Sequence, residues 1–159
     1  MTPHPIPLHP ADWMFVSDGV MGGVSEGAMA FEEHAGEVAL RLTGTVRTER
    51  NGGFIQMRTT LTDRLPETAE ALKIRVRGNR ERYFVHLRTP ASRRPWHSYR
   101  AGFETGPDWR EVTLPFTAFQ PSDPILPAPI APAHVRSVGL VAIGRAHEAD
   151  LWLAAISAA

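Results

Sequence analysis

Three segments in the middle of the chain alternate apolar and polar side chains with a period of two. They cover residues 53–59, 71–78 and 83–88. Successive side chains of a β-strand point to opposite faces, so this alternation predicts strands with one face on a core. The turn-forming residues 78–82 lie between the last two segments and predict a hairpin that joins them. The side chains expected to point into the core are Leu72, Ile74, Val76, Tyr83, Val85 and Leu87.

Shorter stretches complete a chain that is built from strands. Further strands are expected at residues 37–42, 98–104, 110–114, 137–143 and 151–156, and single turns at residues 62–71 and 132–135. No segment carries a sustained apolar stripe with the helical period of about 3.6 residues. Many short strands separated by turn residues are typical of a β-sandwich or a barrel.

The length of the chain and its prolines predict how it is organised. A chain of 159 residues fits a single domain. Residues 1–12 carry alternating prolines, which favour an extended backbone, so we expect an N-terminal arm there and one domain over residues 13–159. Residues 120–134 contain five prolines and predict a stiff crossover loop between two strands. The alternative is a partner-docking loop that exposes Ile125, Leu126 and Ile130.

The composition excludes several classes of function. The chain has no cysteine, so it has no disulfide, no zinc–thiolate site and no thiol nucleophile. Its formal net charge is zero, which gives no general attraction to nucleic acid. No apolar run approaches the ~20 residues that span a bilayer, and the N-terminus lacks a secretory signal. We therefore expect a cytoplasmic protein without a membrane span.

The run of residues 12–25 holds the most distinctive local pattern. An Asp-Gly step begins at Asp18, a double glycine follows at Gly22 and Gly23, and the run ends on Ser25. Glycine permits a positive φ or a close backbone approach, so these residues predict a shaped structural loop. We expect Asp18 to hydrogen-bond the backbone of its own loop. A structural calcium ion is the alternative, but too few carboxylates flank Asp18.

This run also resembles the opening signature of the complex I intermediate-associated protein family, the thirty-kilodalton assembly factor of NADH:ubiquinone oxidoreductase. The signature is a tryptophan followed by Asp-x-Val-Met-Gly-Gly-x-Ser, and residues 13–25 fill it without a gap. The resemblance extends over most of the chain, from Trp13 to Ile156, with Asn79 where aspartate is usual. Later motifs of the family are matched in order by residues 52–58, 74–79, 99–103 and 109–116.

The resemblance implies a galactose-binding-domain-like jelly roll, which is an all-β sandwich of two antiparallel sheets. Mitochondrial members act as chaperone-like factors in building complex I. That role implies a protein partner, with a subunit of a respiratory complex as one candidate. Because the sequence is little longer than the family core, we expect it to be similar to stand-alone bacterial members, without a transit peptide.

A cationic face follows from the same alternation if the three strands share one sheet. Their polar side chains would then lie together on its outer side, and residues 98–104 would add one more. Arginine binds carboxylate and phosphate through two parallel hydrogen bonds, so such a face predicts a groove for an anionic molecule or an acidic partner segment. The alternative is a solvated face whose charges are paired internally. The expected binding residues are Arg58, Arg75, Arg77, His86, Arg88, Arg100 and, on an exposed loop, Trp96.

The residue types that carry catalysis do not form a recognisable site in this sequence. Ser17 and Ser25 lie near glycines, but neither forms a Gly-x-Ser-x-Gly elbow. No histidine has the spacing of a metal site. We therefore expect no enzymatic activity, no metal and no cofactor. The sequence predicts a non-enzymatic, protein-binding module, and a module for carbohydrate or a small anion on a concave sheet face is the alternative.

Overall fold

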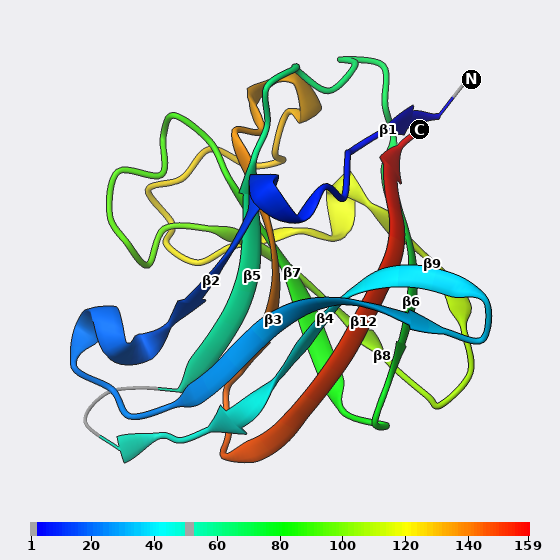
Figure 1. The fold of residues 1–159 in the computed structure, drawn as a ribbon. Helices are drawn as coiled ribbons and strands as arrows, with labels where there is room; N and C mark the ends of the chain where they lie inside the picture. Colours follow the sequence, from blue (N-terminus) through cyan, green and yellow to red (C-terminus); the bar gives the residue numbers. More distant parts are fainter. Residues whose placement is uncertain (1–2, 50–52) are drawn as a thin grey trace.

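The computed structural model describes residues 3–49 and 53–159, without the side chains of residues 20 and 21. It is an all-β sandwich of two antiparallel six-stranded sheets, as predicted (Figure 1). Sheet A has the order β3 (Glu26–His34), β4 (Glu37–Val46), β12 (His147–Ala158), β6 (Ala71–Gly78) and β9 (Arg110–Pro115), and β1 (His4–Pro5) pairs with β12. Sheet B has the order β10 (Gln120–Pro121), β8 (Tyr99–Glu104), β7 (Arg82–Arg88), β11 (Ser137–Ile143), β5 (Phe54–Thr60) and β2 (Trp13–Ser17).

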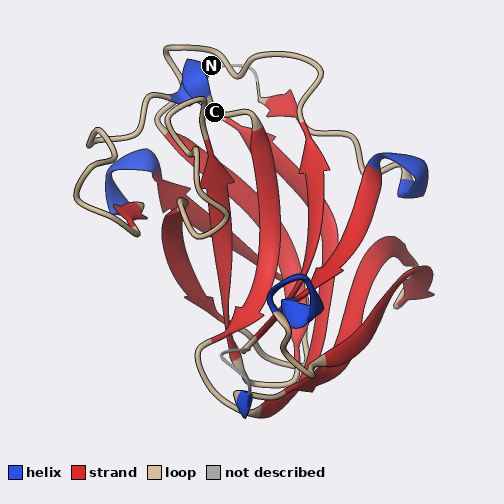
Figure 2. Cartoon of the chain, turned by 90° about the vertical axis from the view of Figure 1, so that its left-hand side faces the viewer, coloured by secondary structure: helices blue, strands red, loops and turns tan. Residues whose placement is uncertain are grey.

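Within residues 3–49 and 53–159, helical structure is confined to short 3₁₀ turns outside the two layers (Figure 2). The turn expected at residues 132–135 is one of them. In the described part of the chain, no helix is long and apolar enough to cross a membrane. The turns are η1 (Pro10–Asp12), η2 (Asp18–Met21), η4 (Phe116–Ala118) and η5 (Pro132–His134).

The core lies between the two sheets. All six side chains predicted to point inward are buried there, each with at most 1% of its surface exposed. Three of them come from β6 in sheet A and three from β7 in sheet B. Burying a leucine or valine side chain contributes about 1.5–3 kcal/mol. The alternation therefore determines which face of each strand turns inward.

The hairpin predicted at residues 78–82 is wrong. β6 pairs with β12 and β9, whereas β7 pairs with β11 and β8, so these residues carry the chain from one sheet to the other. Tyr83 holds this crossing, because its hydroxyl donates to the Asn79 side chain and accepts a 2.9 Å hydrogen bond from the Asp150 backbone. Alternation identifies the inner face of a strand but not its neighbours. The outer side chains of β6 and β7 consequently belong to different sheets.

Besides the two-residue strands β1 and β10, the sequence pattern does not reveal two longer strands, β2 and β3. β2 lies at the start of the run expected to be a loop, and its five residues pair with β5. β3 carries mostly exposed side chains and so lacks a clear alternation, yet all nine of its residues pair with β4. These two segments form strands because their backbones pair with neighbouring strands that the sequence does predict, and not because of their own side-chain alternation.

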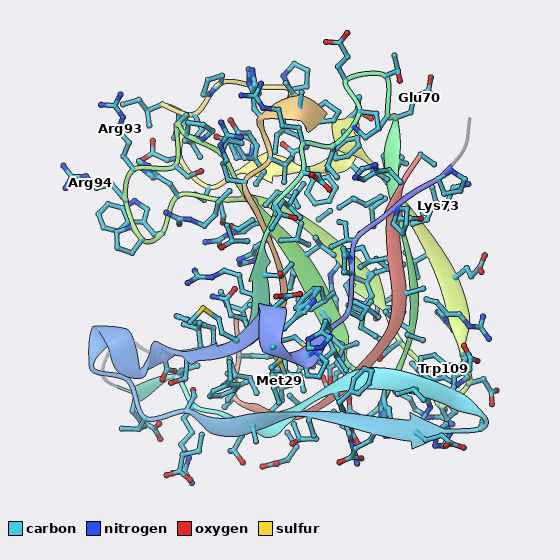
Figure 3. The ribbon with its side chains drawn as sticks, turned by 45° about the horizontal axis from the view of Figure 1, so that its top comes forward. Met29, Glu70, Lys73, Arg93, Arg94 and Trp109 are labelled. Atoms are coloured by element: carbon cyan, nitrogen blue, oxygen red, sulfur yellow. The ribbon has the colours of Figure 1, made fainter. Side chains whose placement is uncertain are left out.

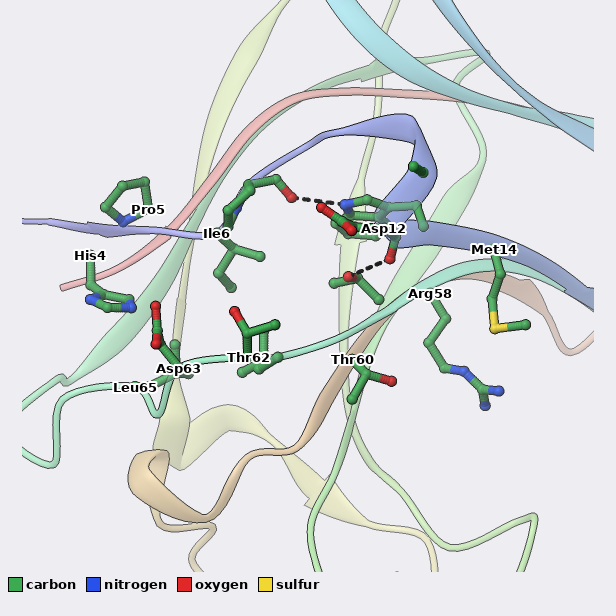
Figure 4. A pocket seen from close by; sticks show the side chains of 15 residues that line it. His4, Pro5, Ile6, Asp12, Met14, Arg58, Thr60, Thr62, Asp63 and Leu65 are labelled. Carbon is green, nitrogen blue, oxygen red and sulfur yellow. Dashed lines mark hydrogen bonds between the residues drawn. The ribbon is translucent and has the colours of Figure 1, made fainter.

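The N-terminal segment is attached to both sheets. β1 pairs with the end of β12, and the backbone N–H of the buried Ile6 donates to the Ile156 carbonyl at 2.9 Å. The Trp13 indole of β2 then donates to the Pro7 carbonyl at 2.9 Å. A pocket of about 320 Å³ lies between this segment and residues 58–65 (Figure 4). The segment is thus tied to the sandwich at several points.

The proline-rich residues 120–134 begin with β10 of sheet B and lead to β11 of the same sheet. Leu126 and Ile130 are buried, with 3% and 4% of their surface exposed, whereas Ile125 is 76% exposed. The Tyr99 hydroxyl donates to the Pro127 carbonyl and holds the segment against β8. The docking-loop alternative, which needs all three apolar side chains exposed, is therefore wrong for Leu126 and Ile130.

Candidate functional site

A groove of about 650 Å³ lies on the outer face of sheet B. Among the described residues that line it there is no aspartate and no glutamate. Outward side chains of β2, β5 and β11 make one end apolar, namely Val16, Phe54, Val141 and Ile143. The middle and the other end carry nitrogen-bearing side chains, namely Arg58, His86, Arg88, Arg100 and Arg136. Trp96 lies on the rim with 54% of its surface exposed.

Three of these side chains lie in one row across the strands. Gly139 of β11 is opposite Arg58 of β5 on one side and opposite His86 of β7 on the other. His86 is in turn opposite Arg100 of β8. Residues that face each other on neighbouring strands point to the same side of a sheet. The sequence prediction of a shared outer face therefore holds for Arg58, His86, Arg88 and Arg100, whose strands all belong to sheet B.

His86 lies deep in this row with an unused hydrogen-bonding atom. Its Nε2 is buried and has no hydrogen-bond partner among the described residues. Burial, and secondarily the charge of Arg100, lower the pKa of His86 to about 3. The imidazole is therefore neutral near pH 7, and one of its nitrogens faces no protein partner.

Arg58 and Arg100 carry charges that no acid in the described part of the chain compensates. Arg100 Nε donates to Ser98 Oγ at 3.0 Å, and its terminal nitrogens have no acceptor there. Burial lowers the pKa of Arg100. No described group accepts a hydrogen bond from the Arg58 side chain. Guanidinium groups stay protonated in proteins, so the groove holds positive charge that an anionic ligand can neutralise.

Arg88 has a different role, because backbone carbonyls occupy its guanidinium. Its Nη1 donates to the carbonyls of Pro95 and His97 at 2.9 and 2.8 Å, and its Nη2 to those of Ser92 and Arg94 at 2.8 and 3.1 Å. All four acceptors belong to the loop that carries Trp96. Arg88 thus shapes one wall of the groove instead of offering its charge to a ligand.

The prediction that Arg75 and Arg77 join this face is wrong. Both lie on β6 of sheet A, because β6 does not pair with β7. Arg75 donates to both carboxylate oxygens of Glu37 at 2.6 and 2.8 Å. Arg77 lies over the ring of Trp152, with 5.3 Å from its Cζ to the ring centroid, and donates to the Pro107 carbonyl. Their interactions therefore stay within sheet A and the segments packed on it.

The same outer side of sheet A is covered by its own side chains. Arg41 lies over Trp152 at 4.6 Å and bonds Asp150 through two hydrogen bonds of 2.9 Å. The Trp109 indole donates to the His34 carbonyl at 3.3 Å, which fastens the end of β3 to the chain before β9. Figure 3 shows Trp109 beside the tip of the β3–β4 hairpin. The charged and aromatic side chains on this side of sheet A therefore interact with one another.

The glycine-containing loop is organised around the buried Asp18. The Asp18 carboxylate accepts hydrogen bonds from the Ser25 hydroxyl, from the Ser25 N–H at 3.0 Å, and from the Gly53 and Phe54 N–H groups at 2.7 and 3.3 Å. Gly22 has a φ of 85°, in the left-handed region. A Cβ on Gly23 would come within 2.5 Å of the Asp18 side chain. Asp18 thus joins its loop to the start of β5.

Metal ligands do not gather anywhere in the described residues: no group of three or more His, Asp or Glu side chains is placed to hold an ion. The groove also contains a residue that the sequence pattern does not single out. Arg136 lies just before the apolar β11, where a lone arginine was the available signal. Its backbone N–H donates to the Arg88 carbonyl at 2.7 Å, and this contact brings it beside the end of β7.

The two-sheet architecture defines a class of β-sandwich that carbohydrate-binding modules share. The family 11 module from Clostridium thermocellum, in complex with a β-1,3-1,4-mixed-linked tetrasaccharide, matches with a TM-score of 0.76 and 10% identity over 98% of this chain and 94% of that chain. The family 30 module of a cellulosomal cellulase of Clostridium thermocellum matches with a TM-score of 0.66 and 14% identity over 99% and 92%. At such identities the likeness establishes the fold alone.

The sequence itself gives the family. The family model for complex I intermediate-associated protein 30 (CIA30) matches residues 5–154. The chain therefore belongs to the CIA30 family, and the resemblance carried by its ordered motifs is confirmed. A comparison with curated proteins finds no match.

Proposed function

We propose that this chain is a non-enzymatic binding domain that holds an acidic segment of a partner protein in the groove of sheet B. The observation that carries the proposal is the uncompensated charge of Arg58 and Arg100 in a groove whose described lining contains no acid. The family is named for its association with complex I intermediates. An assembly-factor or chaperone-like role, with a respiratory-complex subunit as a candidate partner, agrees with that name.

The division of the groove favours a polypeptide ligand. One end offers branched and aromatic side chains, including Val16, Phe54 and Ile143, and the middle offers arginines. An extended peptide presents side chains of both kinds at short intervals. A segment that alternates acidic and apolar residues therefore matches both parts of the groove.

Carbohydrate binding is the second candidate, and Trp96 favours it. An exposed indole on the rim of a groove can stack on the apolar face of a sugar ring, because it is large, flat and partly in water. The fold is also that of the carbohydrate-binding modules described above. The arginines favour a sugar acid over a neutral glucan in this case.

The test compares ligands by titration while the tryptophan fluorescence of the protein is followed, to which the exposed Trp96 contributes together with three other tryptophans. The probes are a short synthetic peptide of alternating glutamate and leucine, the same peptide with glutamine for glutamate, a mixed-linked glucan tetrasaccharide and trigalacturonate. We expect the acidic peptide to bind and the glutamine peptide not to bind. The Trp96→Phe variant, followed by calorimetry, separates loss of signal from loss of binding.

Two outcomes would overturn the proposal. Binding of an oligosaccharide together with no binding of the acidic peptide would replace the protein partner with a carbohydrate. Equal binding of the acidic and the glutamine peptides would show that the charged side chains of the groove do not contribute to peptide binding.

A further inference from the structure

Sheet A has a long and accessible strand, β3, at its border (Figure 1). All nine residues of β3 pair with β4 without a shift in register, and each of them is exposed or half-buried. In the described part of the chain, no backbone group outside β4 bonds to the backbone of β3. The outer edge of β3 therefore presents free N–H and C=O groups, which are a template for pairing with another strand.

The other borders of the two sheets have the usual protection against such pairing, which is a short strand or a proline. β10 has two residues, one of them Pro121, β2 has five residues, and β9 ends on Pro115. β3 contains neither proline nor lysine, and its protecting charges are Glu26, Glu32 and Glu33. A strand that pairs with β3 must consequently keep its own acids away from these three glutamates.

We infer that the free edge of β3 is an interface between two copies of this chain, which pair antiparallel about Ala30. Such an interface is isologous, because the same strand of both copies lies on either side of a two-fold axis. Residues whose numbers add up to 60 then face each other, so that Ala30 faces Ala30 of the second copy. This inference concerns sheet A and does not rest on the function proposed for the groove of sheet B.

The middle of β3 is self-complementary in this register. Met29 faces Phe31 of the second copy, and Phe31 faces its Met29. Met29 packs against the core, and Phe31 is opposite the buried Leu40, so these side chains lie on the core side of sheet A. Phe31 is 46% exposed in the single chain. Pairing would cover it with a thioether, which makes favourable contacts with aromatic rings.

The charges of β3 are also matched in this register. Each glutamate faces a histidine or a residue with little or no side chain. The facing pairs are Glu26 with His34, Gly27 with Glu33, and Ala28 with Glu32. Glu32 in addition bonds Arg41 of its own chain at 3.0 Å. No glutamate therefore lies directly opposite another.

A shift of the register in either direction removes this match. Facing residues point to the same side of a sheet, so the neighbouring registers are centred on Met29 and on Phe31. Pairing about Met29 would place Glu26 opposite Glu32, and like charges in facing positions are destabilising. Pairing about Phe31 would place the apolar Met29 opposite Glu33. The sequence of β3 thus favours one centre, Ala30.

The turn between β3 and β4 determines which backbone groups are free. Ala35 and Gly36 have φ values of 52° and 81°, as in a two-residue type I′ turn. Such a turn is closed by a hydrogen bond between its flanking residues, here His34 and Glu37. Bonding alternates along an antiparallel pair, so even-numbered residues of β3 bond β4 and odd-numbered ones, such as Met29, present N–H and C=O to the free edge.

The first experiment measures association by sedimentation equilibrium from about 1 μM to 1 mM, because an interface made by one strand is small and gives a weak dimer. We expect a monomer–dimer equilibrium. Ala28→Lys places a cation opposite Glu32 of the second copy and should strengthen dimerisation several-fold, whereas Ala28→Glu should weaken it by at least as much. Thr113→Lys and Thr113→Glu, at an exposed position of β9, should leave it unchanged.

Two results of this experiment would overturn the interface. One is a protein that stays monomeric at the highest concentration. The other is a pair of Ala28 variants that do not shift the equilibrium in opposite directions.

The second experiment tests the register with single cysteines, since the chain has none of its own. Ala30→Cys places two thiols in a facing, non-hydrogen-bonded pair, with Cα atoms about 4.5 Å apart, which is within the range of a disulfide. In the control Ala28→Cys, the two thiols lie four residues apart along the strands, or about 13 Å. On mild oxidation we expect a covalent dimer of Ala30→Cys and a monomer of Ala28→Cys.

Preferential cross-linking of Ala28→Cys, or no cross-linking of a folded Ala30→Cys protein, would overturn the register. Melting temperatures show whether the variants are folded, and the exposed Ala28 variants keep the test decisive if Ala30→Cys is not.

A strand of another protein is the alternative occupant of this edge. Amide shifts in β3 on addition of the acidic peptide, in a protein that does not self-associate, would assign the edge to a partner strand and overturn the dimer. Peptide binding that maps to the groove, together with loss of dimerisation in Ala28→Glu, supports the dimer. Failure of the dimer leaves the proposed function of the groove unchanged, and failure of the groove leaves the dimer unchanged.

Discussion

Single residues in this protein organise segments much longer than themselves. The Asp18 carboxylate joins the turn that follows β2 to the start of β5 through two hydrogen bonds, from Gly53 and Phe54, and accepts two more from Ser25 of its own loop. Burial of Asp18 raises its pKa, but the hydrogen bonds from Ser25, Gly53 and Phe54 outweigh burial and hold the pKa below its ordinary value. The charged form of Asp18 is therefore the one that stabilises the fold.

This shift predicts how stability depends on pH. Unfolded aspartate has a pKa of about 3.9. Because the folded pKa of Asp18 is lower, the unfolded chain binds more protons, and the contribution of Asp18 is complete above pH ~4 and disappears as pH falls through the folded pKa. Urea unfolding of the original protein and of Asp18→Asn, measured from pH 7 to pH 3, checks this.

We expect Asp18→Asn to be less stable at pH 7 and to lose less stability on acidification than the original protein. The variant controls for the remaining carboxylates, which titrate in both proteins. Parallel pH profiles of the two proteins would contradict the assignment of the low pKa to Asp18.

At the scale of elements, one side chain of β7 determines the shape of a loop on the groove's rim. Arg88 gathers four carbonyls of residues 92–97, and burial, with a smaller effect of the Arg58 charge, lowers its pKa. Arg93 and Arg94 at the tip of this loop point away from the sandwich (Figure 3). Arg88 of β7, and not the outward side chains of the loop, thus fixes the conformation of residues 92–97.

Replacing Arg88 by glutamine should loosen this loop without unfolding the core. Hydrogen bonds to a charged group contribute about 1.5–3 kcal/mol each, and glutamine cannot replace four of them. We expect faster amide hydrogen exchange at residues 92–97 and weaker binding of the acidic peptide, with exchange in β11 unchanged. Arg93→Gln is the matched control in the same loop, and equal exchange in the two variants would show that Arg88 does not hold it.

The elements also show what the sequence could predict. Period-two alternation identifies β6 and β7 and their inner faces, because burial of side chains such as Ile74 and Val85 dominates the local pattern. It says nothing of which strand pairs with which, since pairing is made by backbone groups that every residue carries. That Arg58 and Arg100 share one sheet face was accordingly predicted correctly, whereas Arg75 lies on the other sheet, and the place of Gly139 between Arg58 and His86 became recognisable only through its neighbours on β5 and β7.

At the scale of the whole molecule, positive and negative charges are equal in number but are distributed unevenly over the surface. The formal net charge is zero, yet positive side chains without described acidic partners gather in the groove, while the outer side of sheet A pairs Arg41 and Arg75 with acids. Long-range attraction of an acidic partner is therefore weak. Under the proposed function, recognition would depend instead on short-range contacts in the groove.

The salt dependence of binding should reflect this arrangement. The screening length falls from about 10 Å at 0.1 M salt to about 3 Å at 1 M. We expect the affinity for the acidic peptide to fall several-fold over this range in the original protein and to fall less in Arg58→Gln. Arg64→Gln should behave like the original protein, and a salt dependence that is identical in all three proteins would contradict a role for Arg58.

The way Arg88 holds the rim has a consequence for how this protein can change over generations. The guanidinium bonds only backbone carbonyls, which remain whatever side chains residues 92–97 carry. Exposed positions such as Trp96, Arg93 and Arg94 can therefore be exchanged while the loop keeps its course. If the groove binds a partner as proposed, descendants of one ancestral domain could change what they bind by single substitutions on this rim, without any adjustment of the sandwich beneath it.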